Sequence, residues 1–246
     1  MANYRFGKHP PKHDYRTLRL KNYLTAALAA PPPAYDSLPR VYKKLGSTNA
    51  AKLFPMDGND TLGDCTIAAA AHAATLFKGL VGKKAIAQAA GLEKIYFHLT
   101  GGVDSGLQEL DVLNYWRKSA ISGEKILAYA SVDVKNQTHV KQAIQLFGGV
   151  YLGFQVQQDC QQQFDDGKPW LPGPLTKHGH AVLAVAYDAK GVTVLTWGNT
   201  QQGTWAWWDE CVDEAYAILP AEAKAKDFAP GFDFAQLKED LAQVAN

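Results

Sequence analysis

The spacing of apolar residues along the chain changes near residue 149. Before this point, apolar residues recur every three or four positions, which is the period of an amphipathic helix. This pattern predicts helices over 65–78, 84–100, 110–118 and 140–147. A further amphipathic stretch predicts a short surface helix over 234–244.

After residue 149, short runs rich in valine, leucine and aromatic residues are separated by turn residues, which is typical of strands. They predict strands over 150–156, 180–187, 192–199, 203–208 and 214–219. We therefore expect an α+β fold with a helical half at 38–148 and an antiparallel β half at 149–220. Functional sites commonly form in the cleft between two such halves.

The segments outside these elements are polar or rich in proline. Residues 1–37 form a basic, proline-punctuated arm with a weakly helical stretch over 14–28. Residues 41–57 and 157–178 have the composition of loops, and 221–246 form a polar tail that carries the last helix. Two roles stay open for the arm: it blocks the cleft, as an inhibitory segment would, or it straps the back of the domain.

Composition narrows the function classes. The 246 residues are 47% hydrophobic and carry a net charge of +1, so nothing in the charge balance favours nucleic acid or an anionic membrane as a partner. No apolar run reaches the ~20 residues of a membrane helix, and the N-terminal residues lack the apolar core of a secretory signal. We expect a soluble, cytoplasmic protein.

The cysteines and histidines do not suggest a disulfide framework or a metal site. Three cysteines are too few for a framework, and the odd number leaves at least one thiol free unless two chains are bridged. His9 and His13 are separated by Pro10 and Pro11, which argue against one helical face. We expect no metal and no cofactor.

One stretch has the layout that a nucleophilic thiol needs. A polar, glycine-punctuated loop over 58–64 runs into Cys65, where an alanine-rich helix is predicted to begin. Asp64 is expected to cap this helix, and the free N–H groups of the first turn favour a thiolate. The alternative is a buried structural cysteine beside a helix cap. His72 lies about 10 Å further along the helix, so it cannot be the base and is expected to pack internally.

A predicted hairpin offers the base and a residue to orient it. If the turn centres on residues 189 and 190, His180 lies opposite Asn199 on the neighbouring strand. The amide of Asn199 then accepts one imidazole N–H, while the other ring nitrogen faces the thiol, and Trp197 shields the pair on the same face. A one-residue bulge would remove Asn199 from this role. Alternatively, His180 only begins a strand and Asn199 is a turn residue. The rival base, His178, is expected to be exposed.

Acyl transfer also needs donors for the developing oxyanion. The backbone N–H of Cys65 is one, and the amide of Asn59, six residues upstream, is the second candidate. The alternative for Asn59 is a simple turn residue.

These residues resemble the papain-like cysteine peptidase family, including uncharacterised bacterial and phage members, over roughly residues 38–220. That family has an amide side chain six residues before its cysteine and a glycine two before it, as Asn59 and Gly63 stand to Cys65. The family's His-Ala-Val strand corresponds to 180–182, and its Ser-Trp-Gly segment to Thr-Trp-Gly at 196–198.

The chain departs from the family pattern in three ways. Asparagine replaces the usual glutamine at position 59, and Leu195 stands where the family has an asparagine before Ser-Trp-Gly. The disulfides and inhibitory propeptide of secreted members have no clear signature. Asp64 puts a negative charge next to the thiol, which opposes thiolate formation unless the carboxylate is occupied in capping.

The resemblance implies a cysteine peptidase or amidase that acts on peptide or isopeptide bonds of a peptide or protein substrate. His180 takes the proton of Cys65, the thiolate attacks the carbonyl, Cys65 N–H and Asn59 hold the oxyanion, and His180 protonates the leaving amine. Two alternatives stay open: a transpeptidase-like acyl transferase on the same fold, and a binding protein that has lost catalysis. Side-chain preference and oligomeric state are open as well.

Overall fold

The computed structural model describes residues 4–83 and 89–244. The first part of the chain is mainly helical, and its elements are β1 (Leu18–Arg19), η1 (Leu20–Tyr23), β2 (Tyr35–Asp36), α1 (Leu38–Leu45), α2 (Ala50–Leu53), α3 (Cys65–Leu80), α4 (Ala89–Thr100), α5 (Glu109–Lys118), β3 (Ile126–Ser131) and α6 (Gln137–Phe147). The second part holds β4 (Val150–Gln157), α7 (Cys160–Asp165), β5 (Leu175–Tyr187), β6 (Gly191–Thr196), β7 (Asn199–Thr204), α8 (Trp205–Cys211), β8 (Val212–Pro220), η2 (Ala225–Asp227) and α9 (Phe234–Val244).

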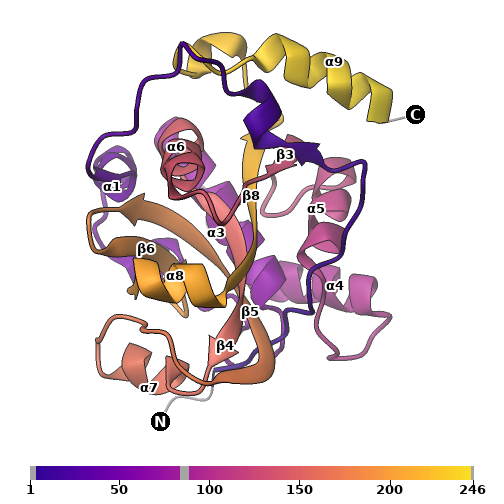
Figure 1. Cartoon of the computed structure of the whole chain (residues 1–246). Helices are drawn as coiled ribbons and strands as arrows, with labels where there is room; N and C mark the ends of the chain where they lie inside the picture. The colour runs from indigo at the N-terminus through magenta and orange to yellow at the C-terminus, as the bar shows by residue number, and fades with distance from the viewer. Residues whose placement is uncertain (1–3, 84–88, 245–246) are drawn as a thin grey trace.

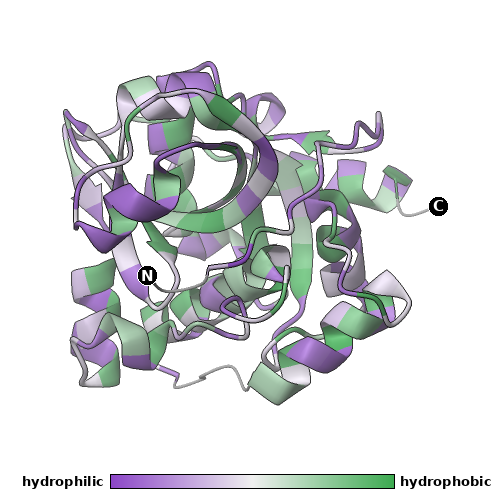
Figure 2. Ribbon diagram, turned by 90° about the horizontal axis from the view of Figure 1, so that it is seen from below, coloured by the Kyte–Doolittle hydropathy of each residue, from purple (hydrophilic) through white to green (hydrophobic). Residues whose placement is uncertain are grey.

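All of these strands belong to one sheet, in the order β1-β3-β8-β4-β5-β6-β7, with β2 paired to β5. Neighbouring strands are antiparallel except for the parallel pair β1 and β3. Seen from below, part of the sheet curls into an open ring (Figure 2). The expected α+β class, with a helical half and an antiparallel β half, is confirmed.

From His180 onward, strand β5 is buried on both faces, and each face packs into a different hydrophobic core. Val182 and Ala184 of β5 point into the core of the β half, together with α6. Ala181, Leu183 and Val185 of the same strand point into the core of the helical half, together with α3. Because successive strand residues face opposite sides, β5 presents neighbouring residues to the two halves.

Helix α3 passes through the centre of the molecule (Figure 1) and carries Cys65 as its first residue. Every residue of α3 except Lys78 and Leu80 is buried, as expected for a helix that is apolar all round. Its small side chains permit close packing: a Cβ added at Gly79 would lie 2.5 Å from Cγ1 of Val41 on α1. Helix α3 therefore packs closely against α1, and it also packs against β5.

Several sequence predictions of elements are confirmed and others are wrong. The helices near 65–78, 110–118, 140–147 and 234–244 are present. The predicted helix over 84–100 is present from Ala89, and residues 84–88 lie outside the described part of the chain. The strand predicted over 203–208 is wrong: β7 ends at Thr204, whose side chain caps α8 by accepting the N–H of Trp207. The segments expected to be irregular contain α1, α2 and α7, and β3 was not predicted.

The N-terminal arm is integrated into the fold. Instead of the weak helix expected over 14–28, it forms β1, which pairs with β3, and the short η1. Further along, β2 pairs with the far end of β5. The arm thus wraps around both halves, as the indigo chain in Figure 1 shows. Within the described residues, no helix is both long and apolar enough to span a membrane.

Candidate active site

Cys65 lies where α3 meets β5, and only 1% of its surface is exposed. Burial raises the pKa of this thiol to about 12, although hydrogen bonds from the backbone N–H groups of Ala181 and Gly7 act in the opposite direction. The contact with Ala181 brings the residue that directly follows His180 to the sulfur. The structure therefore brings together the helix start and the strand that the sequence singled out.

Asp64 does not cap α3 through its side chain, contrary to our expectation. Its carboxyl group is buried beneath the loop, and burial raises its pKa to about 8, while the Asn59 amide acts to lower it. The residue is therefore mainly protonated at pH 7. The negative charge that would oppose a thiolate is suppressed by burial rather than by capping.

His180 is held from one side of its ring by a hydroxyl group. Its Nε2 lies 2.8 Å from Oγ1 of Thr196, at the end of β6. The ring stacks on Trp197 at 4.6 Å between centroids, with the edge of Phe154 at 5.6 Å. The opposite nitrogen, Nδ1, is buried and has no hydrogen-bond partner among the described residues. Such an arrangement leaves Nδ1 for the thiol and uses Nε2 to fix the ring.

The expected register between His180 and Asn199 is wrong. Tyr187 does face Val192, but the pairing shifts between Ala184 and Ala186. At this bulge the Val185 carbonyl accepts hydrogen bonds from the backbone and side chain of Ser37 instead of continuing the ladder. Strand β6 then ends at Thr196, and Thr196 takes the position beside His180.

Asn199 lies on the far side of a tight turn. It pairs with Thr196 across the β6–β7 hairpin, is exposed, and its side-chain oxygen accepts the N–H of Thr200. The two turn residues, Trp197 and Gly198, have φ values of 46° and 72°, as a two-residue hairpin turn of this hand requires. Asn199 is thus a turn-flanking residue and does not contact His180.

The turn also fixes Asn59. A tryptophan with positive φ is unfavourable, but here the indole is held on both sides. Nε1 of Trp197 donates to Oδ1 of Asn59 at 2.9 Å, and Tyr4 stacks on the ring at 4.4 Å. With its oxygen occupied in this way, the Asn59 amide directs its NH₂ group to two carbonyl oxygens, those of Leu62 and Arg5, both at 3.1 Å.

The segment Tyr4–His9, which we call the cleft segment, lies across Cys65 in an extended conformation. On one side, Lys8 N donates to Gly179 O at 3.1 Å. On the other side, Leu107 N donates to Gly7 O at 2.8 Å and His9 N donates to Leu107 O at 2.9 Å. Arg5 N donates to Asn59 O at 3.0 Å. The chain's own backbone is thus bound at the thiol from both halves of the molecule.

A glycine is required where the cleft segment crosses the loop before Cys65. A Cβ added at Gly7 would lie 1.7 Å from the carbonyl oxygen of Gly63. The loop is itself fixed, because Gly63 N donates to Asp104 Oδ1 at 3.0 Å and Tyr96 OH donates to the same oxygen at 2.6 Å. Close backbone-to-backbone contact at this point excludes any larger side chain.

The buried site holds its two central groups in their neutral forms. Burial lowers the pKa of His180 to about 3, with a smaller contribution in the same direction from His72, and burial raises that of Cys65. The resting pair is therefore a thiol and a neutral imidazole. The aromatic rings of the cleft segment contribute to this burial, since Phe6 contacts His180 edge-on at 5.6 Å.

His72 and His178 behave as the sequence predicts. His72 is buried in α3 and its Nε2 lies 2.8 Å from Pro55 O and 3.4 Å from Asp57 Oδ2. His178 is exposed.

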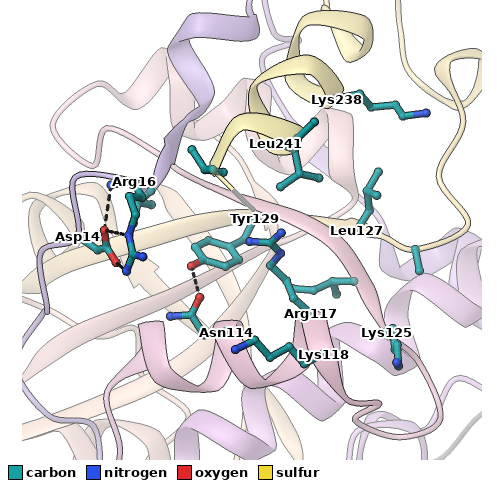
Figure 3. A pocket seen from close by; sticks show the side chains of 15 residues that line it. Asp14, Arg16, Asn114, Arg117, Lys118, Lys125, Leu127, Tyr129, Lys238 and Leu241 are labelled. Carbon is teal, nitrogen blue, oxygen red and sulfur yellow. Dashed lines mark hydrogen bonds and ion pairs between the residues drawn. The ribbon is translucent and has the colours of Figure 1, made fainter. Parts of the chain in front are cut away.

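No group of three or more metal-ligating side chains occurs within residues 4–83 and 89–244. A cavity of about 810 Å³ lies between α5, β3 and α9 (Figure 3), and Cys65 is not among the residues that line it. Its lining includes five cationic side chains, of Arg16, Arg117, Lys118, Lys125 and Lys238, and no cysteine.

Comparisons with solved structures identify the architecture. The chain is similar to xylellain, a cysteine protease from Xylella fastidiosa, with a TM-score of 0.66 and 18% identity over 88% of this chain and 96% of that one. The chain has the papain-like fold. A procathepsin L2 from Tenebrio molitor is similar at TM-score 0.65 and 12% identity, over 89% of this chain and 79% of that one.

A cysteine protease from Carica candamarcensis, solved in complex with E-64, is similar at TM-score 0.54 and 14% identity, over 78% of this chain and all of that one. No family model and no curated protein matches the sequence. At these identities the likeness establishes the fold, and the chemistry has to be argued from the residues themselves.

Thr196 is the site residue that sequence reasoning missed. The resemblance aligned it with the serine of Ser-Trp-Gly and directed attention to position 195, which is the apolar Leu195. A usable signal was present, because Thr196 is the last polar residue before the turn glycine and lies next to Trp197. Only the bulge in β5 brings its hydroxyl to His180, and a bulge leaves little trace in the sequence.

Proposed function

We propose that this protein is a cysteine peptidase whose resting state is latent. The observation that carries the proposal is the cleft segment: an extended peptide lies across a thiol at a helix N-terminus, bound through its backbone on both sides. A site that holds peptide backbone beside a cysteine and a histidine has the parts that acyl transfer needs. The papain-like fold supports this assignment.

The proposed reaction uses Cys65, His180, Thr196 and Asn59. Nδ1 of His180 takes the thiol proton, and the thiolate sulfur forms a bond to the substrate carbonyl carbon. The oxyanion accepts hydrogen bonds from Cys65 N–H and Asn59 Nδ2, which already donates to the carbonyl of Arg5 in the resting state. His180 returns the proton to the amine as the C–N bond breaks, and water then hydrolyses the thioester.

Thr196 serves here as the residue that orients His180. Its hydroxyl oxygen accepts the Nε2 proton, which leaves the lone pair of Nδ1 directed away from Thr196. A hydroxyl group also donates, so it fixes the tautomer less strictly than an amide oxygen would. We therefore infer a slower enzyme than one with an amide at this position.

Latency follows from how the cleft segment is bound. The N–H of Gly7 points to the sulfur, and its carbonyl oxygen is held away by Leu107. The segment therefore covers the thiol without presenting the Gly7 carbonyl for attack. Of the two roles left open for the arm, residues 4–9 fit the inhibitory one and the strands β1 and β2 fit the strap.

Release of the cleft segment tests this proposal. Full-length chain carrying Gly7→Ala is incubated with a fluorogenic peptide mixture, and Gly7→Ala with Cys65→Ala is the matched control. We expect hydrolysis that requires Cys65 and exceeds that of the unaltered chain. Peptide binding without any turnover would instead indicate a binding protein, and transfer to an added amine in preference to water would indicate an acyl transferase.

A further inference from the structure

The side chain of Lys8, in the cleft segment, is buried in a pocket of acids. It is 1% exposed, and its Nζ lies 2.9 Å from Asp213 and 3.0 Å from Oε1 of Glu214. Nζ also donates to His9 O at 3.2 Å. A lysine is rarely buried to this extent unless its charge is paired. Glu109, Asp213 and Glu214 form what we call the acidic pocket.

Glu109 makes this pocket unusual. The residue is fully buried, and neither carboxylate oxygen has a hydrogen-bond partner within the described residues. Burial raises its pKa well above the usual value, Glu214 and Asp213 raise it further, and Lys8 lowers it. A buried carboxyl group without hydrogen bonds is costly, so Glu109 adds nothing to the fold that an apolar residue would not. Because Glu109 lies close to the buried cation of Lys8, a role in binding that cation accounts for its presence.

Gly153 shapes the pocket around a long, straight cation. A Cβ added there would lie 1.8 Å from Cε of Lys8 and 2.8 Å from Oε1 of Glu109. The lysine stem therefore passes directly over the backbone of β4, and Glu109 closes the pocket beside it. Glu214 is positioned independently, because Tyr216 OH donates to its second oxygen at 2.8 Å. Glu214 is thus held by the fold as well as by Lys8.

The backbone of the cleft segment is bound in a way that any extended peptide reproduces. Lys8 N bonds Gly179 O on β5, and the flanking Gly7 O and His9 N bond Leu107. Backbone pairing of this kind gives affinity without sequence preference, and the side-chain pockets along it supply specificity. The side chain at the Lys8 position is the buried one.

We propose that the acidic pocket is a specificity subsite that takes the lysine side chain of a peptide substrate, and that Lys8 fills it until a substrate replaces the cleft segment. The proposal rests on the peptidase function above. When Lys8 leaves, Glu109 and Glu214 lose the cation that faces them among the described residues, so a substrate lysine is preferred to a neutral residue.

Binding tests the subsite separately from catalysis. The receptor is the full-length chain with Gly7→Ala and Lys8→Ala, which unseats the cleft segment, and with Cys65→Ala to prevent turnover. The ligands are the heptapeptide of residues 4–10 and the same peptide with norleucine in place of lysine, measured by titration calorimetry. We expect the lysine peptide to bind at least about tenfold more tightly, as for a buried charged pair. Equal affinities would overturn the proposal.

Variants assign the preference to the pocket. Glu214→Gln keeps the shape of the side chain and the hydrogen bond from Tyr216. It should reduce the ratio of the affinity for the lysine peptide to that for the norleucine peptide. Asp213→Asn, at a partly exposed position, is the second variant in case the first fails to fold. Gly91→Ala, which has open space around it, should leave the ratio unchanged. A ratio that survives both acid variants would contradict the proposal.

Hydrolysis separates this inference from the peptidase proposal. The same chain with Cys65 intact is given peptides in which one lysine or norleucine is moved through successive positions. A lysine preference in kcat/KM at one position supports both proposals. Cleavage with no lysine preference, together with equal affinities, overturns the subsite and leaves the peptidase standing. Selective lysine binding with no cleavage of any peptide overturns the peptidase and leaves the subsite.

Discussion

Gly7→Ala should unseat the cleft segment and expose Cys65, and the size of the effect follows from the contacts. The new Cβ would lie 1.7 Å from Gly63 O and 2.3 Å from Gly63 C, so both clashes are with backbone. The Gly63 loop cannot give way cheaply, because Asp104 and Tyr96 hold it. Gly7 has no positive φ, so alanine brings no strain of its own.

The expected magnitude compares this clash with what holds the segment. Overpacking of this kind costs about 1–3 kcal/mol or more. Four backbone hydrogen bonds anchor residues 5–9, each contributing about 0.5–1.5 kcal/mol. The clash therefore offsets a large part of the binding, and the open fraction should rise roughly 5- to 150-fold.

Alkylation of Cys65 by iodoacetamide, followed by peptide mass spectrometry at pH 7 to 9, measures the open fraction. In the unaltered chain the reaction should be slow, because burial raises the pKa of this thiol to about 12. Gly7→Ala should accelerate it by the same factor as the open fraction, and Gly91→Ala should not. Cys160 and Cys211, both buried and free, report global unfolding. Unchanged Cys65 reactivity, or equal acceleration of all the thiols, would refute the reasoning.

Two other substitutions test the electrostatics of the site. Thr196→Val removes the hydroxyl group bonded to His180, so kcat of the released enzyme should fall about tenfold or more while Tm changes little. Partial recovery of kcat in Thr196→Asn would show that orientation of His180 is the cause. An unchanged kcat in Thr196→Val would exclude this role. Asp64 has its pKa raised from 3.8 to about 8, so its folded state loses stability as pH rises from about 4 to 8. The Tm advantage of Asp64→Asn should therefore grow over that range and level off above it, and an advantage independent of pH would show that Asp64 is ionised when folded.

The parts of the molecule that depend on local pattern were predictable from sequence. Helix α3 begins at Cys65 as expected, because a polar, glycine-bearing loop meets a run of alanines. His180 was found because it begins the apolar run of the strand that pairs with β6, and Asn59 because of its spacing from the thiol. The structure brings Cys65 into contact with Ala181, next to His180, and the catalytic roles of Cys65, His180 and Asn59 stay predictions.

What failed depends on single-residue irregularities and on distant segments. Strand pairing followed the predicted register until the bulge at Val185, beyond which every opposite residue changes. This shift removes Asn199 from the position beside His180 and brings Thr196 there. The sequence predicts Asp64 as a helix cap, because the burial of its carboxyl group cannot be recognised from local sequence. The sequence left open whether the N-terminal arm blocks the cleft, because Gly7 and Gly63 are 56 positions apart and only the folded chain brings them into contact.

The cleft segment opposes catalysis by desolvation as well as by occupancy. Phe6 contacts the His180 ring and Tyr4 covers Trp197, so both sides of the site are closed by aromatic rings. The same burial that raises the pKa of Cys65 lowers that of His180, and both shifts disfavour the thiolate–imidazolium pair. Departure of one short segment therefore hydrates the thiol and the imidazole together and moves their pKa values toward each other. Because a charged substrate lysine then replaces Lys8 in the acidic pocket, we expect the same few residues to control both activation and substrate selectivity.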